Sequence, residues 1–284
     1  WHWLAYLFAA FGVLTVFGTG NATQVNTITT AIDSALINYG VIEAGKSGTL
    51  NLIIGIVLAA LIALILLGGI KRIGRVTEKL VPFMAVVYIL LALGVILLNI
   101  KNVPGVFASI FEGAFSPASV TGGAVGSFFM SMKKGVSRGI FSNEAGLGTG
   151  SIAHACADTQ KPVKQGFFGI FEVFVDTIVI CSCTAMIMLL APEEKVAGLS
   201  GMDLLQTAME HHLGRFGVIF IAATLFLFSF STFLGILFYA RSNVAYLFGD
   251  SWAWQTAYKV LALVMLFIGG LAAYTFVWDL GDVG

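Results

Sequence analysis

The sequence predicts an all-α polytopic membrane protein, and three observations support this fold class. Of the 284 residues, 58% are hydrophobic, and the mean hydropathy is +0.94. Only 11% are charged, against about 25% in an ordinary soluble domain, so the chain lacks the polar surface that a soluble fold needs. Residues 52–70 and 80–100 are long apolar runs without the alternation of barrel strands, and roughly 20 apolar residues suffice for a spanning helix.

Seven membrane segments follow from this pattern. They are residues 3–37, 49–70, 79–100, 124–157, 166–190, 214–238 and 256–278. Pro82 falls in the first turn of the third segment, where proline is tolerated, and a short surface helix is expected at 106–114. We expect one transmembrane domain over residues 1–284. Because the chain opens at Trp1 within an apolar segment and closes just after another, we expect it to be truncated at both ends.

Charge predicts the orientation and excludes nucleic-acid binding. The 15 basic and 15 acidic residues cancel, so no basic surface is available for nucleic acid. If the segments alternate, eight basic residues share one side and three lie on the other, with Lys133, Lys134 and Arg138 unassigned. The eight are Lys71, Arg72, Arg75, Lys79, Lys161, Lys164, Arg241 and Lys259. The positive-inside rule makes that side cytoplasmic, which puts the acidic loop 191–213 outside a multi-pass cytoplasmic-membrane protein.

The fourth segment is expected to be broken. Glycine recurs five times within residues 135–150, and Ser142, Asn143 and Glu144 lie at the centre. Such a stretch favours two half-helices that meet in an unwound gap, which a bilayer tolerates only where protein or a water-filled cavity satisfies the backbone. Free N–H groups there suit a carboxylate, and free carbonyls suit a cation. The alternative is a glycine-rich loop that binds nothing.

Polar residues on three other segments predict partners for this gap. Gln24 lies on a polar helical stripe, where it either reaches a substrate or forms an interhelical hydrogen bond. Asp176 lies near mid-bilayer, where it either ligates a cation with Thr177 or pairs with a buried arginine such as Arg138. The adjacent hydroxyls of Ser231 and Thr232 suit Na⁺, although such hydroxyls can instead bond to their own helix.

Enzymatic chemistry has no support in the sequence. No mid-helix histidine pair is present to hold haem, and Ser151 with His154 lacks a third catalytic group. Gly146-x-Gly148-x-Gly150 follows no strand and departs from the dinucleotide spacing. We therefore expect neither an enzyme nor a cofactor.

The motifs resemble the alanine or glycine:cation symporter family, the sodium:alanine symporters. The strongest match is the run from Arg138 to Gly148, RGIFSNEAGLG, followed by Ile152-Ala153-His154-Ala155. Supporting matches are Gly20-Asn21-x-x-Gln24-x-Asn26, Asp176-Thr177-Ile178-Val179-Ile180-Cys181 and Phe230-Ser231-Thr232-x-x-Gly235. The resemblance covers essentially the whole chain in order. It implies a partial leucine-transporter-like inverted-repeat fold, with a broken helix at a central site and further helices on either side of this chain.

By this resemblance, Gln24, Phe141, Ser142 and Asn143 face an amino acid, and Ser231 and Thr232 hold Na⁺. Asp176 and Thr177 form a second candidate cation site. Ile236 stands where the family usually has tryptophan, so the pocket wall is smaller and admits a larger substrate. Ala240-Arg241 replaces the usual Gly-Glu, which reverses a charge at the cytoplasmic end.

The sequence thus predicts sodium-coupled symport of small neutral amino acids, alanine or glycine, in the cytoplasmic membrane. Its expected partners are the amino acid, Na⁺, the lipid bilayer and the missing N- and C-terminal helices of the same protein. Two alternatives remain, a proton-coupled amino-acid transporter of the same fold and a non-transporting membrane subunit.

Overall fold

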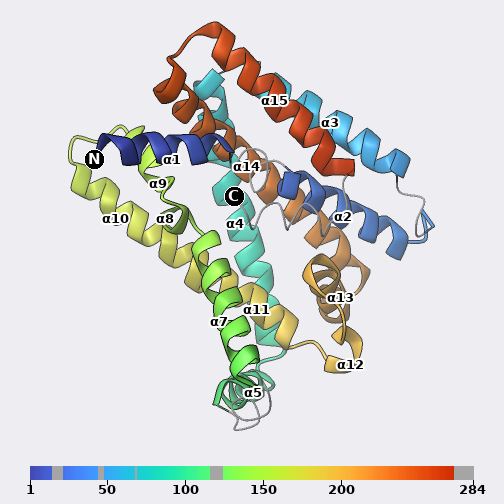
Figure 1. The fold of residues 1–284 in the computed structure, drawn as a ribbon. Coiled ribbons are helices and arrows are strands. Elements are labelled where there is room, and N and C mark those ends of the chain that lie inside the picture. The colour runs from blue at the N-terminus through green and yellow to red at the C-terminus, as the bar shows by residue number, and fades with distance from the viewer. Residues whose placement is uncertain (15–21, 44–47, 68, 116–123, 272–284) are drawn as a thin grey trace. The chain divides into compact units, whose positions relative to one another are not determined.

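The computed structural model describes residues 1–14, 22–43, 48–67, 69–115 and 124–271, and every regular element in these ranges is a helix (Figure 1). The helices are α1 (His2–Leu14), α2 (Ala22–Asn38), α3 (Gly48–Leu67), α4 (Gly69–Leu98), α5 (Val103–Phe115), α7 (Ala124–Phe141), α8 (Glu144–Leu147), α9 (Gly150–Ala155), α10 (Pro162–Val173), the π-helix η2 (Phe174–Ile180), α11 (Cys181–Leu189), α12 (Glu193–Val196), α13 (Gly201–Leu213), α14 (Arg215–Phe248) and α15 (Trp252–Leu271).

Several of these helices are long and apolar enough to cross a membrane. Among the described residues, four spans meet the length and hydropathy expected of a crossing helix: Arg75–Leu98, Pro162–Leu189, Arg215–Phe248 and Trp252–Gly270. Shorter apolar helices cover His2–Leu14, Gly48–Leu64 and Val103–Gly113. The predicted class of an all-helical polytopic membrane protein is therefore supported, because these helices leave large apolar side chains such as Phe167 and Phe171 exposed.

The structure corrects the sequence-based boundaries in four places. Helix α14 continues past the expected end at residue 238 to Phe248, so Arg241 lies on this helix and not in a loop. Helix α4 begins at Gly69, so Lys71 to Lys79 lie on its first turns and not in a loop. Pro82 is consequently inside a helix rather than in its first turn. Residues 201–213, expected as loop, form α13, which buries Leu205, Ala208 and Met209. The first expected segment contains two helices, α1 and α2, and residues 15–21 between them lie outside the described residues.

The chain divides into two compact units. Unit 1 comprises residues 1–87, 200–206 and 214–284, and its apolar core joins α2, α3, α14 and α15. Figure 1 shows α15 beside α3. The largest core side chains include Leu58, Ile62, Phe233, Leu237 and Leu266. Asn26 on α2 donates its amide to the Gly269 carbonyl of α15 at 3.2 Å, which satisfies a buried polar group between two apolar helices.

Unit 2 comprises residues 88–199 and 207–213 and carries the broken segment. Val106 on α5 packs with Met186 and Leu190 at the end of α11. The Tyr88 hydroxyl of α4 and the Thr184 hydroxyl of α11 are hydrogen-bonded at 2.6 Å. Helix α10 lies against α8 and α9, so the elements around the break form one connected group.

Candidate functional site

The predicted break in the fourth segment is confirmed. Helix α7 ends at Phe141, and Ser142 and Asn143 are not helical. Asn143 has an extended backbone (φ −141°, ψ 160°), and its Oδ1 accepts a hydrogen bond from the Gly146 amide at 2.9 Å. The same amide also donates to the Asn143 carbonyl at 3.2 Å. Asn143 therefore acts as the N-cap of α8.

Two glycines explain why the chain breaks at this point. A Cβ on Gly146 would lie within contact distance of the Ile140 carbonyl oxygen and 2.8 Å from the carbonyl carbon, so only glycine fits against the end of α7. Gly148 ends α8 in the left-handed region, at φ +81°, and donates to the Glu144 carbonyl at 2.9 Å. The expectation of a single second half-helix was therefore wrong, because these turns divide it into α8 and α9.

The π-helix η2 faces the two non-helical residues. The Ser142 hydroxyl donates to Asp176 Oδ2 at 2.9 Å, and the Asn143 side-chain amide donates to Thr177 Oγ1 at 3.0 Å. Four predicted site residues thus come together in unit 2. The sequence anticipated a cation or an arginine as the partner of Asp176, and the structure shows the Ser142 hydroxyl in that place.

A cavity of about 280 Å³ borders the break and is lined by Glu144, Ser151, His154 and Glu172 among others. Thr149 donates to the Glu144 carboxylate. His154 Nε2 lies 3.8 Å from Glu172 Oε2, and its Nδ1 is 2.7 Å from the Gln165 amide nitrogen. The described residues hold no group of three His, Cys, Asp or Glu side chains placed to bind a metal ion.

Sequence reasoning missed most of this cavity. It assigned no role to Glu172, and it considered His154 only beside Ser151 and within a motif. The contact between His154 and Gln165 joins α9 to α10 across a connection, and no spacing rule signals such a pair. Gly169 also allows His154 to approach α10, because a Cβ at that position would lie 3.0 Å from His154 Nε2. Only the structure reveals this role of the glycine.

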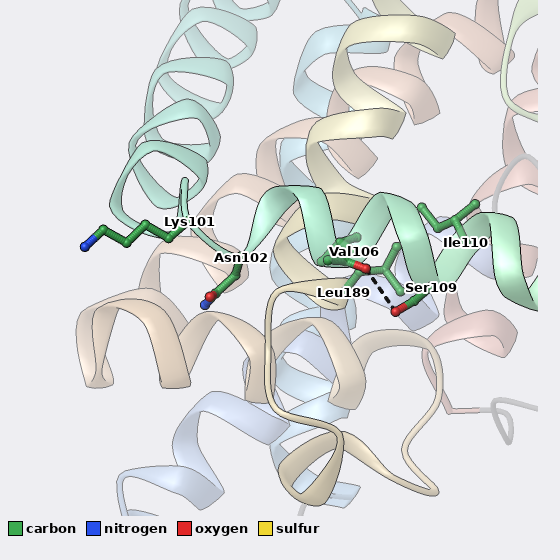
Figure 2. Close-up of a pocket in the computed structure, with 7 residues that line it drawn as sticks. Lys101, Asn102, Val106, Ser109, Ile110 and Leu189 are labelled. Atoms are coloured by element: carbon green, nitrogen blue, oxygen red, sulfur yellow. Dashed lines mark hydrogen bonds between the residues drawn. The ribbon is translucent and has the colours of Figure 1, made fainter.

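A larger hollow of about 510 Å³ lies elsewhere in unit 2, between α5 and the end of α11. Figure 2 shows Lys101 directed away from it, while the Ser109 hydroxyl donates to the Gly105 carbonyl of its own helix at 3.0 Å. None of the predicted site residues lines this hollow. None of them lines the smaller cavity either. The candidate site is therefore the polar break itself, where Ser142 and Asn143 are hydrogen-bonded to η2, with the smaller cavity beside it.

The remaining predicted residues belong to unit 1, apart from Phe141, whose side chain lies outside the described residues. Gln24 is half-buried on α2, and Ile236 packs against the apolar core. Ser231 is buried and its hydroxyl donates to the Phe228 carbonyl at 2.8 Å, whereas Thr232 is exposed. In this conformation the Ser231 hydroxyl bonds to its own helix, as the second interpretation of that motif described.

Membrane-crossing helices and a segment interrupted by a hydrogen-bonded polar gap define a helical membrane protein with a candidate ligand site. Comparison with known proteins identifies the family: residues 1–284 match the sodium:alanine symporter family. The chain belongs to this family, whose members are transporters and not enzymes, so the resemblance seen in the motifs is confirmed.

Three relatives illustrate the similarity. The chain is 37% identical to the amino-acid carrier protein AlsT of Bacillus subtilis, with 99% of this chain and 57% of the relative aligned. It is 38% identical to a Bacillus subtilis protein named "Probable sodium/glutamine symporter GlnT", over 99% and 56%. It is 36% identical to the sodium/alanine symporter AgcS of Methanococcus maripaludis, over 98% and 58%. The chain thus spans less than two thirds of the length of these relatives.

Proposed function

We propose that the complete protein is a sodium-coupled symporter of small neutral amino acids, such as alanine or glycine, and a multi-pass protein of the cytoplasmic membrane. Family membership supports amino-acid symport, and relatives bear names of sodium/alanine and sodium/glutamine symporters. The leucine-transporter-like inverted repeat is part of this proposal. Because the chain covers little more than half of these relatives, the activity belongs to the protein with its remaining helices.

The observation that carries the proposal is the hydrogen-bonding capacity at the break. Asn143 uses its oxygen for Gly146 and one N–H for Thr177, which leaves its second N–H for a substrate carboxylate. The Ser142 hydroxyl donates to Asp176 and lies 3.5 Å from the Cys181 sulfur, and its oxygen has acceptor capacity for an ammonium group or a cation. A donor on Asn143 and an acceptor on Ser142 thus lie on adjacent residues of a membrane segment. They match the carboxylate and the ammonium group of an amino-acid zwitterion.

Gln24, Phe141 and Ile236 complete the proposed substrate contacts, and Ser231 with Thr232 is the first proposed Na⁺ site. Asp176 and Thr177 form the second candidate Na⁺ site. Ile236 offers less bulk than tryptophan, which supports acceptance of side chains larger than that of alanine. Binding of Na⁺ raises amino-acid affinity, and linkage requires the amino acid to raise Na⁺ affinity by the same factor, commonly about 1–3 kcal/mol.

Uptake of labelled alanine into proteoliposomes that contain the full-length protein tests this function. We expect uptake with an inward Na⁺ gradient and little with K⁺ in its place. Uptake that is indifferent to this exchange but driven by a pH gradient would instead establish the proton-coupled alternative, for which Asp176 beside the break is the candidate relay. Unlabelled glycine and glutamine as competitors then define the size of substrate that Ile236 admits.

A variant pair tests the substrate contact of Gln24. We expect Gln24→Ala to weaken alanine binding. The matched control is Thr27→Ala on the same helix, because the Thr27 hydroxyl already donates to the Thr23 carbonyl at 2.8 Å. Equal affinities in the wild type and Gln24→Ala would remove Gln24 from the site.

A further inference from the structure

Two consecutive residues of η2 hold the two consecutive non-helical residues of the broken segment. Asp176 accepts from Ser142, and Thr177 accepts from Asn143, at 2.9 and 3.0 Å. Each bond joins residues 34 positions apart in the sequence, so neither is a local turn contact. The break is therefore tied, side chain by side chain, to a neighbouring membrane helix.

Consecutive residues of an α-helix do not face one neighbour together, because each step along the helix turns the side chain by about 100°. In this segment the backbone is a π-helix from Phe174 to Ile180, closed by a bond from the Cys181 amide to the Asp176 carbonyl. π-turns are rare and frequent at functional sites. This backbone departure coincides with the two residues that contact the break.

We propose that Asp176 and Thr177 are positioning residues, which hold Ser142 and Asn143 in the orientation that the substrate meets. Asn143 is fixed at both ends of its amide, by Gly146 on the oxygen and by Thr177 on the nitrogen. These two bonds fix the orientation of the remaining N–H, which is the donor available to a ligand. The inference rests on the proposed function only in naming the transported amino acid as that ligand.

The structural part of this inference can be measured without transport. Hydrogen exchange of peptides that cover residues 142–147, in the full-length protein in detergent, reports opening of the break. Thr177→Val keeps the side-chain shape but removes the acceptor, and we expect roughly three- to tenfold faster exchange, the factor for loss of one net hydrogen bond. Thr177→Ser keeps a hydroxyl and is expected to restore slow exchange.

Matched variants separate this contact from general loosening. Thr184→Val removes a hydroxyl of α11 that donates to the Ile180 carbonyl at 2.9 Å and lies 2.6 Å from the Tyr88 hydroxyl of α4. Neither bond involves residues 142–147, so exchange there should be unchanged. Asp176→Asn retains an oxygen that accepts from Ser142, so it should protect the break better than Asp176→Leu. Equal exchange in Thr177→Val and wild type, or equal acceleration by Thr184→Val, overturns the inference.

Transport kinetics distinguish positioning from ion binding. If Thr177 positions Asn143, Thr177→Val raises the alanine KM three- to tenfold, Thr177→Ser restores it, and the number of Na⁺ ions per alanine is unchanged. A lower Na⁺ stoichiometry in Thr177→Val makes Thr177 an ion ligand and overturns the inference. Faster exchange with an unchanged alanine KM supports positioning of the break but places the substrate elsewhere, against the proposed function.

Discussion

Replacement of Gly146 by alanine is the sharpest test of the broken segment. The added Cβ would fall within contact distance of the Ile140 carbonyl oxygen and only 2.8 Å from the Ile140 carbonyl carbon and Cα. Ordinary contact begins near 3.4 Å, so the end of α7 and the start of α8 must separate by more than 0.6 Å. Both partners are backbone, and neither can swing aside as a flexible side chain does.

The expected destabilisation is about 1–3 kcal/mol, the usual range for overpacking at a rigid contact. That energy corresponds to about a 5- to 150-fold larger opening constant for residues 142–149, which hydrogen exchange measures directly. The bond from the Gly146 amide to Asn143 is strained at the same time, so alanine uptake should fall with it. Gly139→Ala is the control, because a Cβ there meets no described atom within 4 Å and alanine favours the helix.

Exchange and uptake of Gly146→Ala within twofold of the wild type would refute the close approach of α8 to Ile140, and with it the geometry of the break. Acceleration by Gly139→Ala as large as that by Gly146→Ala would show that any side chain in this segment loosens it. Either result would mean that the steric contact at Gly146 does not determine where the gap lies.

Two further predictions concern packing and pH. Gly269→Ala places a Cβ against the Ala22 backbone, 2.8 Å from its carbonyl oxygen, so the full-length protein should unfold at lower temperature, whereas Gly94→Ala, which meets nothing described within 4 Å, should not. Burial lowers the pKa of His212, whose Nε2 donates to the Ile187 carbonyl at 3.0 Å. In the unfolded chain His212 has its ordinary pKa near 6.5 and therefore binds a proton more readily than in the folded protein. The neutral His212 contributes its full stabilisation above that pH, and this contribution is lost as the pH falls toward the folded pKa. A thermal-unfolding scan from pH 8 to 5 should show this fall, and His212→Gln should lessen it; equal slopes in both proteins would contradict it.

The break illustrates what glycine composition can predict. The density of glycine over residues 135–150 correctly placed a gap in the segment. It did not distinguish Gly135 and Gly139, which lie inside α7, from Gly146, which approaches the Ile140 backbone, and Gly148, which ends α8. The difference lies in a close backbone approach at one position and a left-handed φ at another. Both are consequences of tertiary geometry, so composition alone contains no sign of them.

Helix α13 shows a different kind of error. Residues 201–213 were assigned to a loop because their charged residues lower the hydropathy below that of a membrane segment. Leu205, Ala208 and Met209 nevertheless recur at helical spacing, and all three are buried. The sequence therefore contains an amphipathic helical pattern. The hydropathy expected of a membrane-spanning helix does not detect such a pattern.

The π-helix marks the limit of sequence reasoning in this protein. Residues 166–190 read as an ordinary apolar helix, and their interpretation singled out Asp176 and Thr177 because polar residues are unusual in such a helix. Which partner they take depends on the extra residue in the η2 turn and on the non-helical path of Ser142 and Asn143. The side chains on each irregular segment are the hydrogen-bonding partners of the side chains on the other, so neither is explained alone. A polar gap in a membrane segment is therefore best sought together with the neighbouring helix that satisfies it, since lipid offers the freed groups no alternative.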